Sequence, residues 1–154
     1  MISLLPAIIG AVVAIKVSSR QINQGWREKK NDVYSKISED ISRLFFCTEE
    51  LYSESVGEKM LDDHRIDTLN NEFGRRLESL KMILAGGSFI VSKEILTELE
   101  VLIKTLANNS YKQQEESFAD FLGRNYDAIK KFKDSFNNLA KKELNIKEHG
   151  LKGD

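Results

Sequence analysis

The sequence predicts an all-α protein in which an N-terminal single transmembrane helix continues into the first helix of an antiparallel four-helix up-and-down bundle. Three observations lead to this prediction. The 154 residues are 41% hydrophobic and 31% charged and include one proline, a composition that favours helices. An uncharged stretch opens the chain, and apolar residues at helical spacing fill the rest in four segments. The length fits one folded domain with an appendage.

The uncharged stretch is the segment ISLLPAIIGAVVAI of residues 2–15. As a helix it is about 22 Å long, or about 28 Å when continued to Arg20, against a hydrocarbon core of about 30 Å. A cleaved signal peptide fits less well, because no basic residue precedes the apolar run and Ala11 to Ala14 matches a cleavage site poorly. We therefore expect residues 1–20 to be an uncleaved transmembrane anchor. The alternative is a soluble helical oligomer that buries residues 2–17 between subunits.

A cluster of cations follows this stretch and predicts its orientation. Its members are Lys16, Arg20, Arg27, Lys29 and Lys30. With one Glu among residues 1–30, this part of the chain has a formal charge of +4, so the remainder carries −5 of the total of −1. Cations beside a membrane span favour the cytoplasmic side. We expect an inner-membrane protein with its N-terminus outside and its bundle in the cytoplasm, and headgroup contacts for the cations nearest the bundle.

Small residues recur on one face of the predicted anchor. The candidate helix-packing face consists of Ala7, Gly10, Ala11 and Ala14. Small side chains let two helices approach closely in lipid. Self-association through this face is therefore a hypothesis.

The remaining helices are predicted from periodicity and from their ends. Only the isolated Gly25 weakens a helix between Val17 and Leu51, so the anchor and the first bundle helix are expected to be continuous. Ser55 and Glu58 have the spacing of a capping box before the second helix, which Gly86 and Gly87 end. Predicted domains are the anchor at 1–20, the cytoplasmic bundle at 21–146 and a polar tail at 147–154.

Two further helices complete the predicted bundle. Ser92 begins the third helix, and Asn108 to Ser110 end it. Ser110 and Gln113 have capping-box spacing before the fourth, whose apolar residues extend to Leu139. Short connections make sequential helices antiparallel.

No residues are arranged for recognisable catalysis. His64 follows two aspartates, but ligands on a helix must recur three or four residues apart, so we expect a solvated helix start. The single cysteine, Cys47, fits a small buried hydrophobe better than a nucleophile. We expect no enzyme activity, no cofactor and no metal. A net charge of −1 and a pI near 6.2 also argue against a nucleic-acid partner.

The segment QGWREKKNDVY of residues 24–34 follows the apolar helix and leads into an amphipathic one. This order over about the first 55 residues resembles that of small bacterial membrane-anchored helical proteins of unknown function. The resemblance is carried by Trp26, Arg27, Glu28 and Tyr34. It implies a membrane anchor and no particular activity.

An anchor joined to a bundle without a catalytic site predicts a non-enzymatic interaction or scaffold module. Its expected partners are the lipid bilayer and either another protein or a second copy of the chain. One alternative is a membrane-active effector, such as a small toxin or a phage-defence component, that acts through oligomerised N-terminal helices.

Overall fold

The computed structural model describes residues 5–108 and 116–144, with only the backbone for residues 5–22, Ser88 and Asn108. Its elements are α1 (Leu5–Ser55), α2 (Asp63–Gly86), the short 3-10 helix η1 (Gly87–Phe89), α3 (Lys93–Asn108) and α4 (Phe118–Glu143). The described residues contain no strand. The all-α prediction is therefore confirmed.

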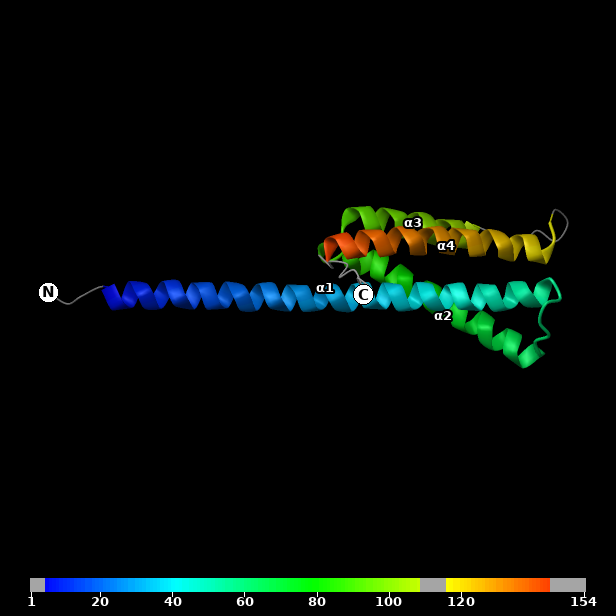
Figure 1. Cartoon of the computed structure of the whole chain (residues 1–154), viewed down its shortest axis with the longest axis horizontal. Helices are drawn as coiled ribbons and strands as arrows, with labels where there is room; N and C mark the ends of the chain where they lie inside the picture. The colour runs from blue at the N-terminus through cyan, green and yellow to red at the C-terminus, as the bar shows by residue number, and fades with distance from the viewer. Residues whose placement is uncertain (1–4, 109–115, 145–154) are drawn as a thin grey trace, which may run out of the picture.

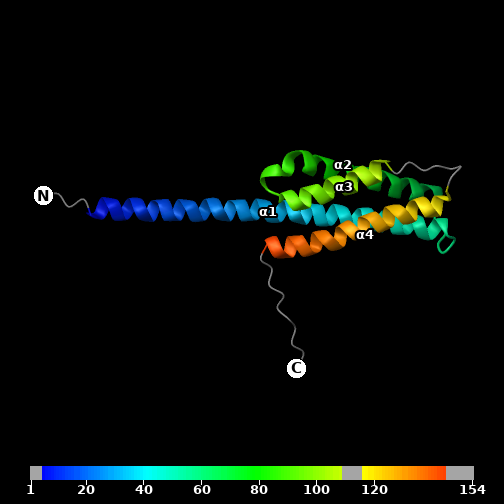
Figure 2. The ribbon, with the colours of Figure 1, turned by 90° about the horizontal axis from the view of Figure 1, so that it is seen from above.

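The four α-helices form a bundle in which α2, α3 and α4 lie beside the C-terminal half of α1 (Figure 1). Helix α1 contacts α2 and α4, and α3 closes the bundle by packing against α2 and α4. Successive helices run in opposite directions, and α2 crosses α1 obliquely (Figures 1 and 2). The predicted helical bundle is thus present.

Helix α1 is one continuous element of 51 residues that passes through Gly25 without a break. The predicted continuity is confirmed. Its N-terminal part projects away from the other helices in both ribbon views (Figures 1 and 2). We call residues 5–25 the arm. At 1.5 Å per residue the arm is about 32 Å long.

The membrane-spanning part of the prediction receives no support from the described residues. Among them, no helix combines the length and the apolar character needed to cross a membrane. The predicted anchor covers residues 1–20, of which residues 1–4 lie outside the described part and residues 5–20 are described as backbone only. Residues 145–154, which include the predicted polar tail, also lie outside it.

The core forms because each helix turns an apolar stripe inward. On α1 the buried residues Tyr34, Ile37, Ile41, Leu44 and Leu51 recur at steps of three and four or their sum, which keeps them on one face. The main core cluster adds residues from α2, the segment before α3, α3 and α4: Leu80, Val91, Ile95, Leu99, Leu102, Ile103, Leu106, Ile129, Phe132 and Phe136. A second cluster lies toward the far end of α1 and contains Cys47, Leu51, Leu69 and Leu122. The bundle therefore has an apolar interior in two clusters, of which the main one begins at Tyr34.

The turn between α1 and α2 corrects the sequence prediction. Ser55 does not begin a helix: it is the last residue of α1, and its hydroxyl donates to the Tyr52 carbonyl at 2.7 Å. Gly57 has φ of 77°, and the Glu58 N–H bonds back to the Ser53 carbonyl at 2.9 Å. This is a glycine-terminated helix end. Ser55 and Glu58 therefore lie at the end of α1, where the chain turns at Gly57. No helix begins at Ser55, so its capping-box spacing with Glu58 does not form a cap.

The N-termini of the other three helices have side-chain caps. Asp62 caps α2 by accepting a hydrogen bond from the Arg65 N–H at 2.7 Å. Ser92 accepts one from the Ile95 N–H at 3.3 Å, so its predicted role at the start of α3 is confirmed. Helix α4 begins with a capping box of Ser117 and Asp120. The predicted box of residues 110 and 113 lies outside the described residues.

Candidate functional site

The residues where α1 leaves the bundle form the candidate site. Trp26, Arg27 and Lys30 of α1 line an open pocket together with Phe89 of η1 and the following Ile90. The two segments meet because the connection from α2 to α3 lies at the same end of the bundle as the arm (Figures 1 and 2). We call this region the arm end of the bundle.

Two aromatic side chains at the arm end are exposed to solvent. Phe89 is 87% exposed and Trp26 is 51% exposed. Neither is needed by the core, which begins at Tyr34. Exposed large apolar side chains that line one pocket indicate a contact surface more often than a single one does.

The cations predicted near the membrane have two different environments. Lys30 forms an ion pair with Glu143 at 2.9 Å, and its Nζ lies 5.3 Å from the ring centroid of Tyr34. Neither Arg27 nor Lys29 has an acidic partner among the described residues, although the Lys29 Nζ lies 6.0 Å from the Trp26 ring centroid. Lys30 thus joins α1 to the end of α4, while Arg27 and Lys29 are exposed.

Glu143 is the centre of the link between α1 and α4. The Tyr34 hydroxyl donates to its carboxylate at 2.5 Å. Burial raises the pKa of Glu143, but hydrogen bonds from Ser92, Tyr34 and Lys30 outweigh it and hold the pKa below its ordinary value. Burial, followed by the bond to Glu143, raises the pKa of Tyr34 to about 12. The group is therefore a charged carboxylate held by a neutral phenol and an ammonium.

The other predicted site residues all lie on the arm. They are Lys16, Arg20, Ala7, Gly10, Ala11 and Ala14. Their side chains are outside the described part, so the topology role of the cations and the packing face of the small residues stay predictions. Their backbone places them on the projecting helix (Figure 1).

A buried ionic cluster at the crossing of α1 and α2 was not predicted. Asp40 is fully buried and accepts hydrogen bonds from Lys36 at 2.9 Å, Arg76 at 2.9 Å and Ser79 at 2.6 Å. Arg76 also donates to Glu39 and Glu72, both at 2.7 Å. The available signal was the position of Asp40 within the apolar stripe, between Ile37 and Ile41.

This cluster keeps Asp40 charged. Burial raises the pKa of Asp40, but the bonds from Ser79, Lys36 and Arg76 together lower it below the ordinary value. Hydrogen bonds to Asp40 and Glu72 raise the pKa of Arg76. Among the described residues, no buried side-chain nitrogen or oxygen lacks a hydrogen-bond partner. The cluster is satisfied, and it joins the two helices.

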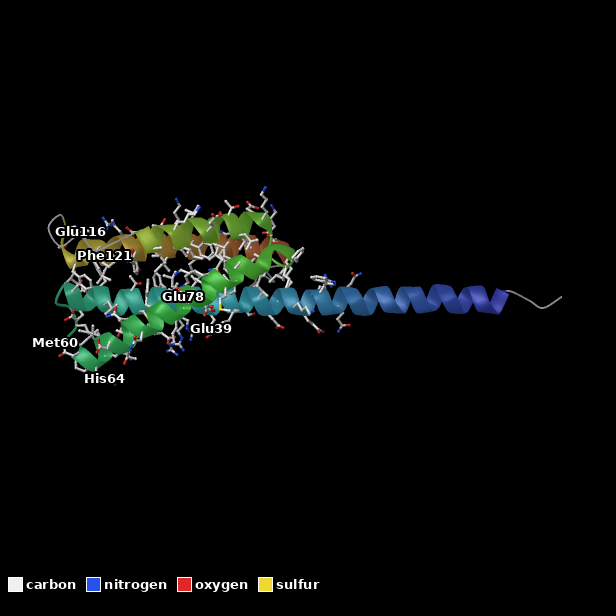
Figure 3. All side chains as sticks on the ribbon, turned by 180° about the vertical axis from the view of Figure 1, so that it is seen from behind. Glu39, Met60, His64, Glu78, Glu116 and Phe121 are labelled. Carbon is white, nitrogen blue, oxygen red and sulfur yellow. The ribbon has the colours of Figure 1, made fainter. Side chains whose placement is uncertain are left out.

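The residues considered for catalysis are placed as expected. His64 is exposed in the first turn of α2, at the end of the bundle opposite the arm (Figure 3). Cys47 is buried, and burial, with the nearby Glu72, raises the pKa of its thiol. Within residues 5–108 and 116–144, no group of three His, Cys, Asp or Glu residues could hold a metal ion.

Comparisons with family models, with curated proteins and with solved structures find no match to this chain. The resemblance of residues 24–34 to membrane-anchored helical proteins therefore stays a prediction. Any function assigned to the chain has to rest on its own residues.

Proposed function

We propose that this chain is a non-enzymatic interaction module that residues 1–20 hold at a lipid bilayer, with the bundle on the cytoplasmic side. One observation carries the proposal: the arm is a continuous part of α1 that projects away from every other described helix (Figures 1 and 2). A helix whose backbone projects away from the other described helices is available to a partner outside the bundle (Figures 1 and 2).

The composition of the arm supports lipid as that partner. Residues 2–15 carry no charged side chain. An uncharged helix of this length would expose an apolar surface larger than monomeric proteins in water usually tolerate. Continued to Arg20, this stretch is about 28 Å long as a helix, which is comparable with a hydrocarbon core of about 30 Å.

The charges beside the arm favour lipid over a second copy of the chain. Lys16 and Arg20 follow the uncharged stretch of residues 2–15, and Arg27 and Lys29 come next without acidic partners among the described residues. Cations at one end of an apolar helix match the cytoplasmic boundary of a membrane span. Two arms packed in parallel in water would instead bring these charges together.

The bundle supplies the interaction part of the proposal. It has a closed core, satisfied buried polar groups and no candidate metal group in the described residues. A rigid helical bundle on a membrane anchor is suited to presenting a surface to a protein partner or to a second copy.

Membrane fractionation of the full chain tests the proposal, with a chain lacking residues 1–20 for comparison. After a carbonate wash we expect the full chain in the membrane pellet and the shortened chain in the supernatant. The matched pair Ile9→Lys and Gln21→Lys adds one cation inside or just beyond the uncharged stretch. A lysine at the centre of a span costs about 3 kcal/mol, so only Ile9→Lys should weaken retention.

Two results would overturn the proposal. One is a full chain that forms a monodisperse oligomer in water without detergent. The other is a shortened chain that stays in the pellet after the wash.

A further inference from the structure

We propose that the arm end of the bundle is a second membrane contact, in which Phe89 and Trp26 lie at the headgroup level of an anionic bilayer and Arg27 and Lys29 bind its phosphates. This inference rests on the proposed function, because the arm must first bring the bundle to the bilayer. It adds a contact by a segment distant in sequence, the η1 turn.

Two aromatic residues of the arm end, Phe89 and Trp26, are exposed to solvent. The Phe89 side chain is 87% exposed on the turn between α2 and α3, although phenylalanine is ordinarily buried. It shares its open pocket with Trp26 from α1. Aromatic side chains with this placement are typical of membrane interfaces, where part of the ring contacts lipid.

The position of Trp26 along α1 places it close to the headgroup layer. About 9 Å of helix separates Arg20 from Trp26, and the headgroup layer beside the hydrocarbon core is about 5 to 8 Å thick. Trp26 therefore lies at the outer surface of the headgroups when Arg20 is at the hydrocarbon boundary. Phe89 lies to one side of α1, and a helix tilt of about 20°, usual for membrane spans, lowers one side of the bundle further toward the lipid.

The positive charges of the arm end favour anionic lipid over neutral lipid. Arg27 and Lys29 are exposed and have no acidic partner among the described residues. Lys30 is excluded from this role because it is paired with Glu143 at 2.9 Å. Exposed cations are attracted to an anionic surface, so two of them bias which face of the bundle meets the membrane.

Trp26 is the only tryptophan in the sequence. Replacing it and introducing one tryptophan elsewhere therefore places the fluorescent probe at a chosen position. The reporter chain carries Trp26→Phe and Phe89→Trp, and the control chain carries Trp26→Phe and Met60→Trp. Met60 is 98% exposed and lies at the end of the bundle opposite the arm (Figure 3). All three substituted positions are at least half exposed, so both chains should fold.

Each full-length chain is reconstituted into phosphatidylcholine vesicles with and without phosphatidylglycerol, and a lipid carrying a headgroup nitroxide is the quencher. We expect the tryptophan at position 89 to lose emission in anionic vesicles and to shift toward shorter wavelength. The tryptophan at position 60 should keep its emission. Adding Arg27→Gln and Lys29→Gln to the reporter chain should remove the difference between anionic and neutral vesicles.

The outcomes separate this inference from the proposed function. If the full chain does not float with vesicles, the proposed function fails and this inference fails with it. If the chain floats but position 89 is quenched no more than position 60, the second contact is wrong and the anchor stands. Equal quenching at position 89 in neutral and anionic vesicles would refute the role of the two cations.

Discussion

At the scale of the residue, Asp40 shows how a carboxylate can be fully buried between two helices. Its oxygens accept hydrogen bonds from Lys36, Arg76 and Ser79, which compensate for the water lost on burial. Removing the charge of Asp40 weakens its bonds to these donors, and of the two cations Arg76, at 20% exposure, has less access than Lys36 to water in place of its lost partner. The sequence shows a charged residue in an apolar stripe but cannot show its partner, because Arg76 is brought to it only by the crossing of α2.

We expect Asp40→Asn to lower the free energy of unfolding by about 3 kcal/mol, since it breaks a buried ion pair and leaves Arg76 partly uncompensated. Urea unfolding followed by circular dichroism measures the change. The matched control is Glu39→Gln, which removes the negative charge from another partner of Arg76 at a side chain that is 55% exposed. It should cost less than about 1 kcal/mol. Equal effects of the two substitutions would refute the burial argument.

The same carboxylate predicts how stability depends on pH. The pKa of Asp40 is lower in the folded chain than its ordinary value, so the unfolded chain binds the proton first as pH falls. Its contribution to stability is therefore complete above an ordinary pKa of about 3.9 and is lost as pH falls through the lower folded value. Glu72 and Glu143 act in the same direction.

We expect the unfolding free energy of the unchanged chain to fall steeply below about pH 4, and that of Asp40→Asn to fall less. Chemical unfolding at a series of pH values measures both slopes. If the unfolding free energies of the two chains depended on pH with the same slope, the pKa of Asp40 would not be lowered in the folded state.

At the scale of the element, the sequence predicted one helix start correctly and another wrongly. Ser92 was correctly expected at the start of α3, because an N-cap acts within its own turn. Ser55 was wrongly expected to begin a helix, because the same spacing occurs at the end of α1, where Gly57 adopts a positive φ. The spacing of two residues therefore predicts an N-cap only when it is also known that a helix begins, and does not end, at that position.

Two glycines provide opposite predictions for the same substitution. Gly57 has φ of 77°, so Gly57→Ala should lower the unfolding free energy by about 1 kcal/mol. Gly74 lies within α2, with no atom near enough to obstruct an added methyl group. Gly74→Ala should raise it by about 0.5 to 1 kcal/mol. Thermal or urea unfolding measures both, and a change of the same sign in both would contradict this account of the turn.

At the scale of the whole molecule, the order of the helices and their apolar faces could be predicted because periodicity is local. The uninterrupted α1 was also correctly expected, since Gly25 alone does not end a helix. The shared pocket of Phe89 and Trp26 could not be predicted, because it depends on where the connection between α2 and α3 lies in the bundle. The ion pair of Lys30 with Glu143 likewise depends on packing between the first and last helices.

The central claim is that the arm lies in a bilayer and the bundle on its cytoplasmic side. Site-specific labelling with a membrane-impermeant maleimide tests it most directly. Cys47 is buried and its thiol pKa is raised, so it should stay unlabelled in the folded chain. Single added thiols come from Val12→Cys in the arm and Ala107→Cys on the exposed surface of α3.

We predict that the thiol at position 107 is labelled in inverted inner-membrane vesicles and protected in intact cells, while the thiol at position 12 is protected in both. Detergent should expose both thiols, which controls for their reactivity. If position 12 is labelled as readily as position 107 in inverted vesicles without detergent, the arm is not in the bilayer and the account is wrong.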